Sequence, residues 1–246
     1  PGPCAAVPGR WQAVRVAVPD WLAADPRVRH HYHRPAVAGV TAPFPGWVGG
    51  DVRAAVQRSG VAELWQHQAV AAEAAHAGRH VALATGTASG KTLGYLLPVL
   101  AAVVDDEVGF EVARRGPLEL GRGHSALYLA PTKALAHDQL RVVNGLELTR
   151  ARVCTLDGDS DAVERRYARD FGRLVLTNPD MLHRSVLPRH QNWTRLLSTL
   201  RYVVVDEAHR YRGVFGAHVS AVLRRLRRLA NHYGADPVFL SASATV

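Results

Sequence analysis

Residues 80–97 constrain the fold of this chain most strongly, because an apolar run leads through a loop of small residues into a helix-forming segment. The run from His80 to Ala84 is typical of a strand, the loop reads Thr-Gly-Thr-Ala-Ser-Gly-Lys, and helical character begins at Thr92. A strand that enters a helix through such a loop places successive backbone N–H groups and a helix N-terminus around one point, where phosphate oxygens bind. The stretch therefore predicts a strand–loop–helix unit with a phosphate site.

Lysine usage points to the same loop. Arginine supplies twenty-eight of the thirty basic side chains, and the two lysines are Lys91, at the end of the loop, and Lys133. A compact ammonium fits a phosphate pocket that a planar guanidinium would overfill. We expect Lys91 to reach the β- and γ-phosphates of a nucleotide and the Thr92 hydroxyl to ligate Mg²⁺. The residues expected to line the nucleotide are Thr85, Gly86, Thr87, Ala88, Ser89, Gly90, Lys91 and Thr92.

The loop needs a distant partner, because the strict form of the motif begins with glycine where this chain has Thr85. The apolar run Tyr202–Val205 supplies one, since it ends in the adjacent carboxylates Asp206 and Glu207. A parallel sheet gathers the C-terminal ends of its strands at one edge, so Asp206 is expected beside the Mg²⁺ on Thr92. Asp206 would hold the ion through water, and Glu207 would orient and deprotonate the water that attacks the γ-phosphate. With Lys91, these carboxylates are the expected catalytic residues, and ATP and Mg the expected ligands.

Six short apolar runs predict the strands of the sheet: 81–84, 126–130, 152–156, 173–177, 202–206 and 237–241. Near-continuous apolar strands separated by helical stretches indicate an α/β fold with a mostly parallel sheet covered on both faces. We expect this lobe over residues 59–246, and before it an arm over residues 1–58, rich in Pro, Gly and Trp and packed on the lobe. A helix is predicted at 217–230 and a polar connection at 105–124.

Composition limits which partners and which cellular compartment the chain is expected to have. A net charge of +9 and a pI near 10.2 suit a polyanionic partner, although arginine enrichment can also follow from genome composition. Cys4 and Cys154 lie far apart without a CxxC pair, which argues against a disulfide framework and fits a reducing cytoplasm. The longest apolar stretch, Leu93 to Val104, is interrupted by proline and too short to span a bilayer, so no membrane partner is expected.

Six ordered motifs give the chain a close resemblance to the first motor lobe of superfamily-two helicases. They are a glutamine motif at Gln68, the phosphate loop, Ala130–Leu135, Thr177–Asp180, the Asp206–His209 box and the Ser243–Thr245 tripeptide. The segment Asp206–Gly216, with its Tyr-Arg-Gly-Val-Phe-Gly extension, looks like the SftH-like and Hrq-like DNA helicases. The resemblance covers residues 60–246 and implies a RecA-like three-layer lobe that a second such lobe would follow.

The resemblance also implies roles for individual residues. Gln68 matches the glutamine that reads adenine, whereas Trp65 either stacks on the base or packs on protein. Ser243 and Thr245 match the motif that links hydrolysis to strand movement, and His209 is expected to bridge to that motif. Arg212 is either a coupling residue or the partner of a neighbouring carboxylate. Contacts to the backbone of a tracked strand, which carry no sequence information, are implied for Thr132, Lys133, Thr177, Asn178 and Asp180.

The resemblance implies an ATP-dependent DNA helicase or translocase that moves toward the 5′ end of single-stranded DNA. The expected partner is single-stranded DNA or a duplex with a single-stranded tail. The protein is expected to be a monomer in a bacterial-type cytoplasm, associated with the nucleoid. Its expected process is DNA repair. An RNA helicase or a restriction-type translocase remains an alternative, separated by which polynucleotide stimulates ATP hydrolysis. By itself, the lobe is either a very weak ATPase or a non-catalytic nucleotide- and strand-binding module, because the arginine fingers of such motors come from the second lobe.

Overall fold

The computed structural model describes residues 20–29, 39–86, 90–105 and 123–244. The chain divides into two compact units, Pro1–Val40 and Thr41–Val246. The described part of the first unit contains the short helix α1 (Asp20–Ala23) and an exposed ion pair of 2.6 Å between Arg27 and Asp25. Residues 41–58, which the sequence assigned to an arm, group with the second unit. Most of the polar connection expected at 105–124 lies outside the described residues.

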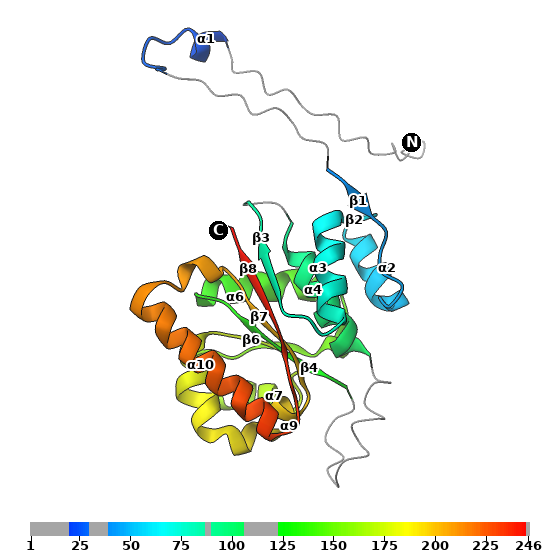
Figure 1. Ribbon diagram of the computed structural model, residues 1–246, viewed down its shortest axis with the longest axis vertical. Helices are drawn as coiled ribbons and strands as arrows, with labels where there is room; N and C mark the ends of the chain where they lie inside the picture. The colour runs from blue at the N-terminus through cyan, green and yellow to red at the C-terminus, as the bar shows by residue number, and fades with distance from the viewer. Residues whose placement is uncertain (1–19, 30–38, 87–89, 106–122, 245–246) are drawn as a thin grey trace. The chain divides into compact units, whose positions relative to one another are not determined.

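A sheet of six parallel strands forms the centre of the second unit, in the order β3-β8-β7-β4-β6-β5 (Figure 1). The strands are β3 (Val81–Ala84), β4 (Ser125–Leu129), β5 (Val153–Thr155), β6 (Leu174–Thr177), β7 (Leu200–Val205) and β8 (Val238–Ser243). All six predicted strands are present, with ends displaced by two residues at most. The predicted α/β fold with a parallel central sheet is confirmed.

Helices cover both faces of this sheet and make three layers (Figure 1). The face of the sheet that carries Tyr128 and Val204 packs against one group of helices, here called the first layer. The opposite face, which carries Leu127 and Val203, packs against a second group, here called the second layer. The first layer consists of α2 (Gly50–Arg58), α3 (Gln66–His76), α4 (Thr92–Val104) and α6 (Lys133–Asn144). The second consists of α7 (Ala162–Asp170), η3 (Leu182–Val186), η4 (Leu187–Trp193), α9 (Thr194–Ser198) and α10 (Gly213–His232). The central strands β4, β6 and β7 are buried almost throughout, which explains why their sequences are mainly apolar, whereas β3, β5 and β8 have partly exposed residues.

Local sequence sets where these helices begin and end. α6 starts after Thr132, whose hydroxyl accepts a hydrogen bond of 3.4 Å from the N–H of Leu135. α10 runs farther than the predicted 217–230, and its buried side chains recur at helical spacing. α4 continues through Pro98, although proline gives no N–H to the helix ladder. Its buried flank explains the continuity, because packing of an apolar face outweighs one missing hydrogen bond.

A short antiparallel pair, β1 (Thr41–Ala42) and β2 (Leu64–Trp65), leads into α3. Trp47 stacks on His76 with ring centroids 4.2 Å apart, and its indole N–H donates a hydrogen bond of 3.0 Å to Glu73. These contacts attach the segment before α2 to α3. Within the described ranges, no helix is both long and apolar enough to cross a membrane.

Candidate functional site

The C-terminal ends of all six strands meet at one edge of the sheet, because every neighbouring pair is parallel. β3 brings the phosphate loop to this edge, and β7 brings Asp206 and Glu207. β4, β6 and β8 lead to Thr132, Asn178 and Ser243. Motifs that are far apart in the sequence therefore lie along a single edge.

Lys91 closes the phosphate loop from within. Its Nζ donates hydrogen bonds of 2.9 Å to the carbonyl oxygens of Thr85 and Gly86. Thr92 is the first residue of α4, so its hydroxyl and the ammonium stand at a helix N-terminus, which favours anions. A phosphate entering the loop can replace the two carbonyl oxygens as the acceptor of the lysine's hydrogen bonds. The predicted nucleotide contacts Thr87, Ala88 and Ser89 lie outside the described residues.

Gln68 connects α3 to the phosphate loop. Its Nε2 donates a hydrogen bond of 2.5 Å to the Gly90 carbonyl, and its Oε1 accepts one of 2.8 Å from the N–H of Trp65. Gly90 has a φ of +74°, and a Cβ there would lie 2.9 Å from Nε2 of Gln68. Only glycine fits this close approach without strain. Because both ends of the carboxamide are used within the protein, the contact of Gln68 with adenine stays a prediction.

Asp206 and Glu207 form a left-handed turn directly after β7. Glu207 has a φ of +49°. This backbone conformation is unfavourable by about 1 kcal/mol for residues other than glycine, and it is found most often at functional sites. Oδ1 of Asp206 accepts a hydrogen bond of 2.8 Å from the N–H of Glu207 and so stabilises the turn. The Glu207 side chain is 31% exposed. Its carboxylate is therefore open to water at the edge where the phosphate loop lies.

Two buried tyrosines, which the sequence did not single out, contact the other oxygen of Asp206. The hydroxyl of Tyr128 donates a hydrogen bond to Oδ2, and the hydroxyl of Tyr95 lies 3.4 Å from the same atom. Tyr95 lies in the first turn of α4, which Thr92 begins. Burial raises the pKa of both phenols well above the ordinary value, and the charge of Asp206 adds to the effect. Both hydroxyls thus stay protonated donors.

Of the residues expected to couple hydrolysis to movement, His209 lies beside Glu207. Nδ1 of His209 lies 3.2 Å from Oε2 of Glu207, without the angle of a hydrogen bond, in the short helix η5 (Ala208–Arg210) that contacts β8. The N–H of Thr85 donates to the Ser243 carbonyl at 3.3 Å, so the phosphate loop is bonded to the end of β8. Arg212 is exposed and immediately precedes α10. Thr245 lies outside the described residues.

Lys133 is exposed at the start of α6 and forms an ion pair with a carboxylate of the protein. Its Nζ lies 2.5 Å from Oδ2 of Asp159, which follows β5 at the same edge. This hydrogen bond raises the pKa of the lysine. Asp157 stabilises the turn that carries Asp159, because its Oδ1 accepts a hydrogen bond of 2.8 Å from the N–H of Asp159. The sequence did not identify this acidic turn as part of the edge.

The remaining predicted strand contacts differ in accessibility. Thr132 and Asp180 are exposed, whereas Thr177 is 2% exposed and donates a hydrogen bond of 2.6 Å to the Leu156 carbonyl. The Thr177 hydroxyl is thus occupied inside the sheet and does not face the edge. Oδ1 of Asn178 accepts a hydrogen bond of 2.9 Å from the N–H of Met181 and caps α8 (Pro179–Met181).

The donors at the edge fit a magnesium ion. Thr92 and Asp206 offer a hydroxyl and a carboxylate, the hard oxygen ligands that Mg²⁺ prefers. Tyr95 lies near both, because its hydroxyl is 3.4 Å from Oδ2 of Asp206 and its helix α4 begins at Thr92. Mg²⁺ commonly takes only one or two protein ligands and completes its shell with phosphates and water.

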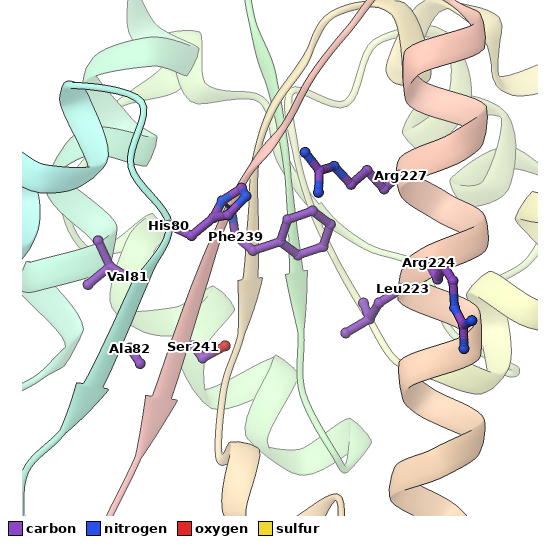
Figure 2. A pocket seen from close by; sticks show the side chains of 8 residues that line it. All are labelled: His80, Val81, Ala82, Leu223, Arg224, Arg227, Phe239 and Ser241. Carbon is purple, nitrogen blue, oxygen red and sulfur yellow. Dashed lines mark hydrogen bonds between the residues drawn. The ribbon is translucent and has the colours of Figure 1, made fainter.

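A groove at the opposite end of β3 and β8 lies apart from these residues. Its empty space is about 500 Å³, between the two strands and α10 (Figure 2). Val81, Ala82 and Phe239 form an apolar floor, and Arg224 and Arg227 line the helix side. His80, at the start of β3, packs edge-on against Phe239. Among the predicted nucleotide and strand contacts that the structure describes, none lines this groove.

Comparison with known proteins agrees with this arrangement of motifs. Residues 65–246 match the family model described as DEAD/DEAH box helicase. The chain is 42% identical to the uncharacterized ATP-dependent helicase YprA of Bacillus subtilis over 212 residues, which cover 84% of this chain and 26% of the relative. The chain thus spans about a quarter of the length of that relative.

Two solved structures share the fold at useful identity. The helicase MrfA bound to DNA and AMPPNP matches with a TM-score of 0.76 and 41% identity, covering 85% of this chain and 28% of that one. The helicase Lhr of Mycobacterium smegmatis, bound to single-stranded DNA and AMP-PNP, matches with a TM-score of 0.65 and 25% identity, covering 83% of this chain and 26% of that one. Both neighbours place a RecA-like lobe where this chain has its parallel sheet.

Proposed function

Because the chain belongs to the DEAD/DEAH box helicase family, we propose that it is the ATP-binding lobe of an ATP-dependent DNA helicase or translocase. The observation that carries this proposal is the convergence of Lys91, Thr92, Asp206 and Glu207 on one sheet edge. A phosphate loop, a metal carboxylate and an exposed carboxylate at one edge form the set of groups that phosphoryl transfer to water requires.

Hydrolysis follows from the placement of these groups. Lys91 exchanges its bonds to the Thr85 and Gly86 carbonyls for bonds to the β- and γ-phosphates, and the N-terminus of α4 adds its partial positive charge. Thr92 would hold Mg²⁺ and Asp206 would hold it through water, and the ion would supply neutralisation of charge on the phosphate oxygens. Glu207 orients a water molecule, accepts its proton as the oxygen attacks the γ-phosphorus, and the bond from that phosphorus to the bridging oxygen breaks.

Coupling to movement starts from bonds between the nucleotide edge and its neighbours. The phosphate loop is bonded to β8 through Thr85 and Ser243, and Glu207 contacts His209. A change in the phosphate loop or in the charge of Glu207 therefore acts directly on the segments that resemble the coupling motifs. We assign His209, Arg212, Ser243 and Thr245 to this role.

The strand is proposed to cross the remaining part of the same edge. Lys133 and Thr132 follow β4, and Asn178 and Asp180 follow β6, which pairs with β4. Contacts from such groups to phosphates do not depend on base sequence, as a motor on DNA requires. The neighbours MrfA and Lhr, whose structures contain DNA and single-stranded DNA, support DNA as the polynucleotide. We propose a single-stranded DNA or a tailed duplex as partner, a monomer as the working unit, and the cytoplasm as its place.

The test is polynucleotide-stimulated ATP hydrolysis by the full-length natural protein with Mg²⁺ present. Single-stranded DNA is expected to stimulate phosphate release, while RNA of the same length and base order does not. Stimulation by RNA alone would replace the DNA motor with an RNA helicase, and stimulation only by long duplex DNA would favour a restriction-type translocase. Absence of any ATP hydrolysis would contradict the proposal itself.

A further inference from the structure

The two tyrosines at Asp206 have hydroxyls that packing does not require. Tyr128 is 4% exposed on the central strand β4, and Tyr95 is 2% exposed on α4. Phenylalanine would fill the same space, and burying a hydroxyl is unfavourable unless it finds a hydrogen-bond partner. Here both hydroxyls approach one carboxylate oxygen, Oδ2 of Asp206. The ring centroids lie 6.1 Å apart, so the two side chains approach that oxygen from separate positions.

The carboxylate of Asp206 is consequently held at both oxygens. Oδ2 accepts from Tyr128, and Oδ1 accepts from the N–H of Glu207 at 2.8 Å. The main chain is fixed as well, because the N–H of Asp206 donates to the Leu129 carbonyl at 3.0 Å. Two bonds to different oxygens define the plane of the carboxylate before any ligand arrives.

The donors are neutral, which matters for an ion site. A lysine or arginine at Oδ2 would cancel the charge that attracts a cation, whereas a phenol orients the oxygen and leaves its charge in place. Oδ1, which accepts from the N–H of Glu207, keeps a second lone pair for another partner. Tyr95 connects the carboxylate to α4, because its hydroxyl lies 3.4 Å from Oδ2 of Asp206 and its helix begins at Thr92.

The geometry points to Tyr128 and Tyr95 as positioning residues that orient the Asp206 carboxylate toward the Mg²⁺ site at the start of α4. This inference rests on the proposed nucleotide site and assigns to it two residues outside its recognised motifs. Outer partners of metal ligands commonly change metal affinity about 10- to 100-fold when they are removed. The loss of the Tyr128 hydroxyl should therefore weaken Mg²⁺ binding without removing the nucleotide pocket.

The experiment compares Tyr128→Phe and Tyr95→Phe in the full-length natural protein with the matched control Tyr202→Phe. Tyr202 is equally buried on β7, but its hydroxyl lies 3.5 Å from the Ala75 carbonyl and contacts no residue of the site. AMP-PNP binding is measured by calorimetry at a series of Mg²⁺ concentrations and in the absence of Mg²⁺. Thermal unfolding of each variant is recorded alongside.

We expect Tyr128→Phe to raise the half-saturating Mg²⁺ concentration by about tenfold, and Tyr95→Phe to raise it less. AMP-PNP affinity without Mg²⁺ should not change in either variant, and Tyr202→Phe should leave the Mg²⁺ dependence unchanged. An unchanged Mg²⁺ dependence in Tyr128→Phe overturns the inference; if that variant does not fold, an unchanged dependence in Tyr95→Phe does so. If the unmodified protein binds AMP-PNP without any effect of Mg²⁺, the proposed metal site fails, and this inference fails with it.

Discussion

The Nζ atom of Lys133 lies 2.5 Å from Oδ2 of Asp159, so the lysine expected to contact a strand phosphate already binds a carboxylate. The Asp159 carboxylate lies where a strand phosphate is expected to contact Lys133, and the Asp159 side chain is 83% exposed. The turn that carries Asp159 is stabilised by a hydrogen bond from its N–H to Asp157. Nε of Arg165 also donates a hydrogen bond of 2.8 Å to the Ser160 carbonyl in this turn. A phosphate that binds this lysine therefore competes with the carboxylate for its charge and its N–H donors.

Replacing Lys133 with alanine should weaken single-stranded DNA binding to a similar extent for all base sequences. One lost phosphate contact lowers the slope of log affinity against log salt by about 0.7 for a single strand. Fluorescence titrations of the full-length natural protein at several salt concentrations measure both quantities. Arg141→Ala is the matched control, because Arg141 is a cation on the same helix that pairs with Asp138. An unchanged slope in Lys133→Ala would remove Lys133 from the strand path.

Replacing Asp159 with asparagine should tighten DNA binding several-fold, because the phosphate no longer competes with a carboxylate for Lys133. Asp138→Asn removes an equal charge from the same region and controls for net charge alone. If Asp159 acts through the lysine, its effect should largely disappear when Lys133 is already alanine. Equal tightening by both asparagine variants would reduce Asp159 to a general contribution of charge.

The sheet could be predicted most readily at β4, β6 and β7, because these strands are buried on both faces and mainly apolar. The pair β1 and β2 was missed, since strands of two residues leave no periodicity in a sequence. α2 was missed because the Pro- and Gly-rich residues before it made residues 1–58 look like one arm. Three buried side chains of α2, Val52, Ala55 and Val56, pack in the same core as α4. Tertiary packing, rather than local composition, decides which unit contains this segment.

The candidate site could be predicted where motif spacing reports chemistry, as at Lys91 and Asp206. Tyr95 and Tyr128 could not be, because a tyrosine within an apolar run is indistinguishable from a core aromatic until its hydroxyl partner is known. Thr177 shows the opposite limitation, since it ends β6 as predicted while its hydroxyl donates to the Leu156 carbonyl. Sequence places a residue at an edge, but neighbouring strands determine where its side chain points.

Lys91→Ala and Glu207→Gln should separate nucleotide binding from hydrolysis. Lys91→Ala removes the charge opposite the phosphates together with the bonds that close the loop, so it should lose both AMP-PNP binding and ATP hydrolysis. Glu207→Gln keeps the size of the side chain but not its basicity, so kcat should fall by about 10²- to 10⁴-fold while nucleotide binding is retained. Calorimetry and DNA-stimulated phosphate release measure the two effects. Unaltered turnover in Glu207→Gln would mean that another group activates the water.

Residues 1–246 expressed by themselves should bind Mg-nucleotide weakly and hydrolyse it very slowly. The lobe holds Lys91, Asp206 and Glu207, while the resemblance to two-lobed motors assigns the arginine finger to another lobe. Such an arginine contributes roughly 10³- to 10⁵-fold to the rate in related chemistry. Phosphate release with single-stranded DNA, compared with the full-length natural protein, measures the difference. Robust DNA-stimulated turnover by these residues alone would show that no second lobe is needed for chemistry.

Gly216→Ala should destabilise the protein, although alanine normally favours a helix. Gly216 lies in the first turn of α10, and a Cβ there would come within 2.5 Å of the Tyr211 carbonyl oxygen. Because this neighbour is backbone, the turn after Glu207 would have to shift, and overpacking of this kind costs about 1 to 3 kcal/mol. Gly50→Ala is the control, since Gly50 begins α2 and a Cβ there would meet nothing within 4 Å. Denaturant unfolding should show a lower midpoint for Gly216→Ala and an equal or higher one for Gly50→Ala. If both substitutions leave the midpoint equal or higher, the close contact between Gly216 and Tyr211 does not restrain the turn that carries the catalytic carboxylate.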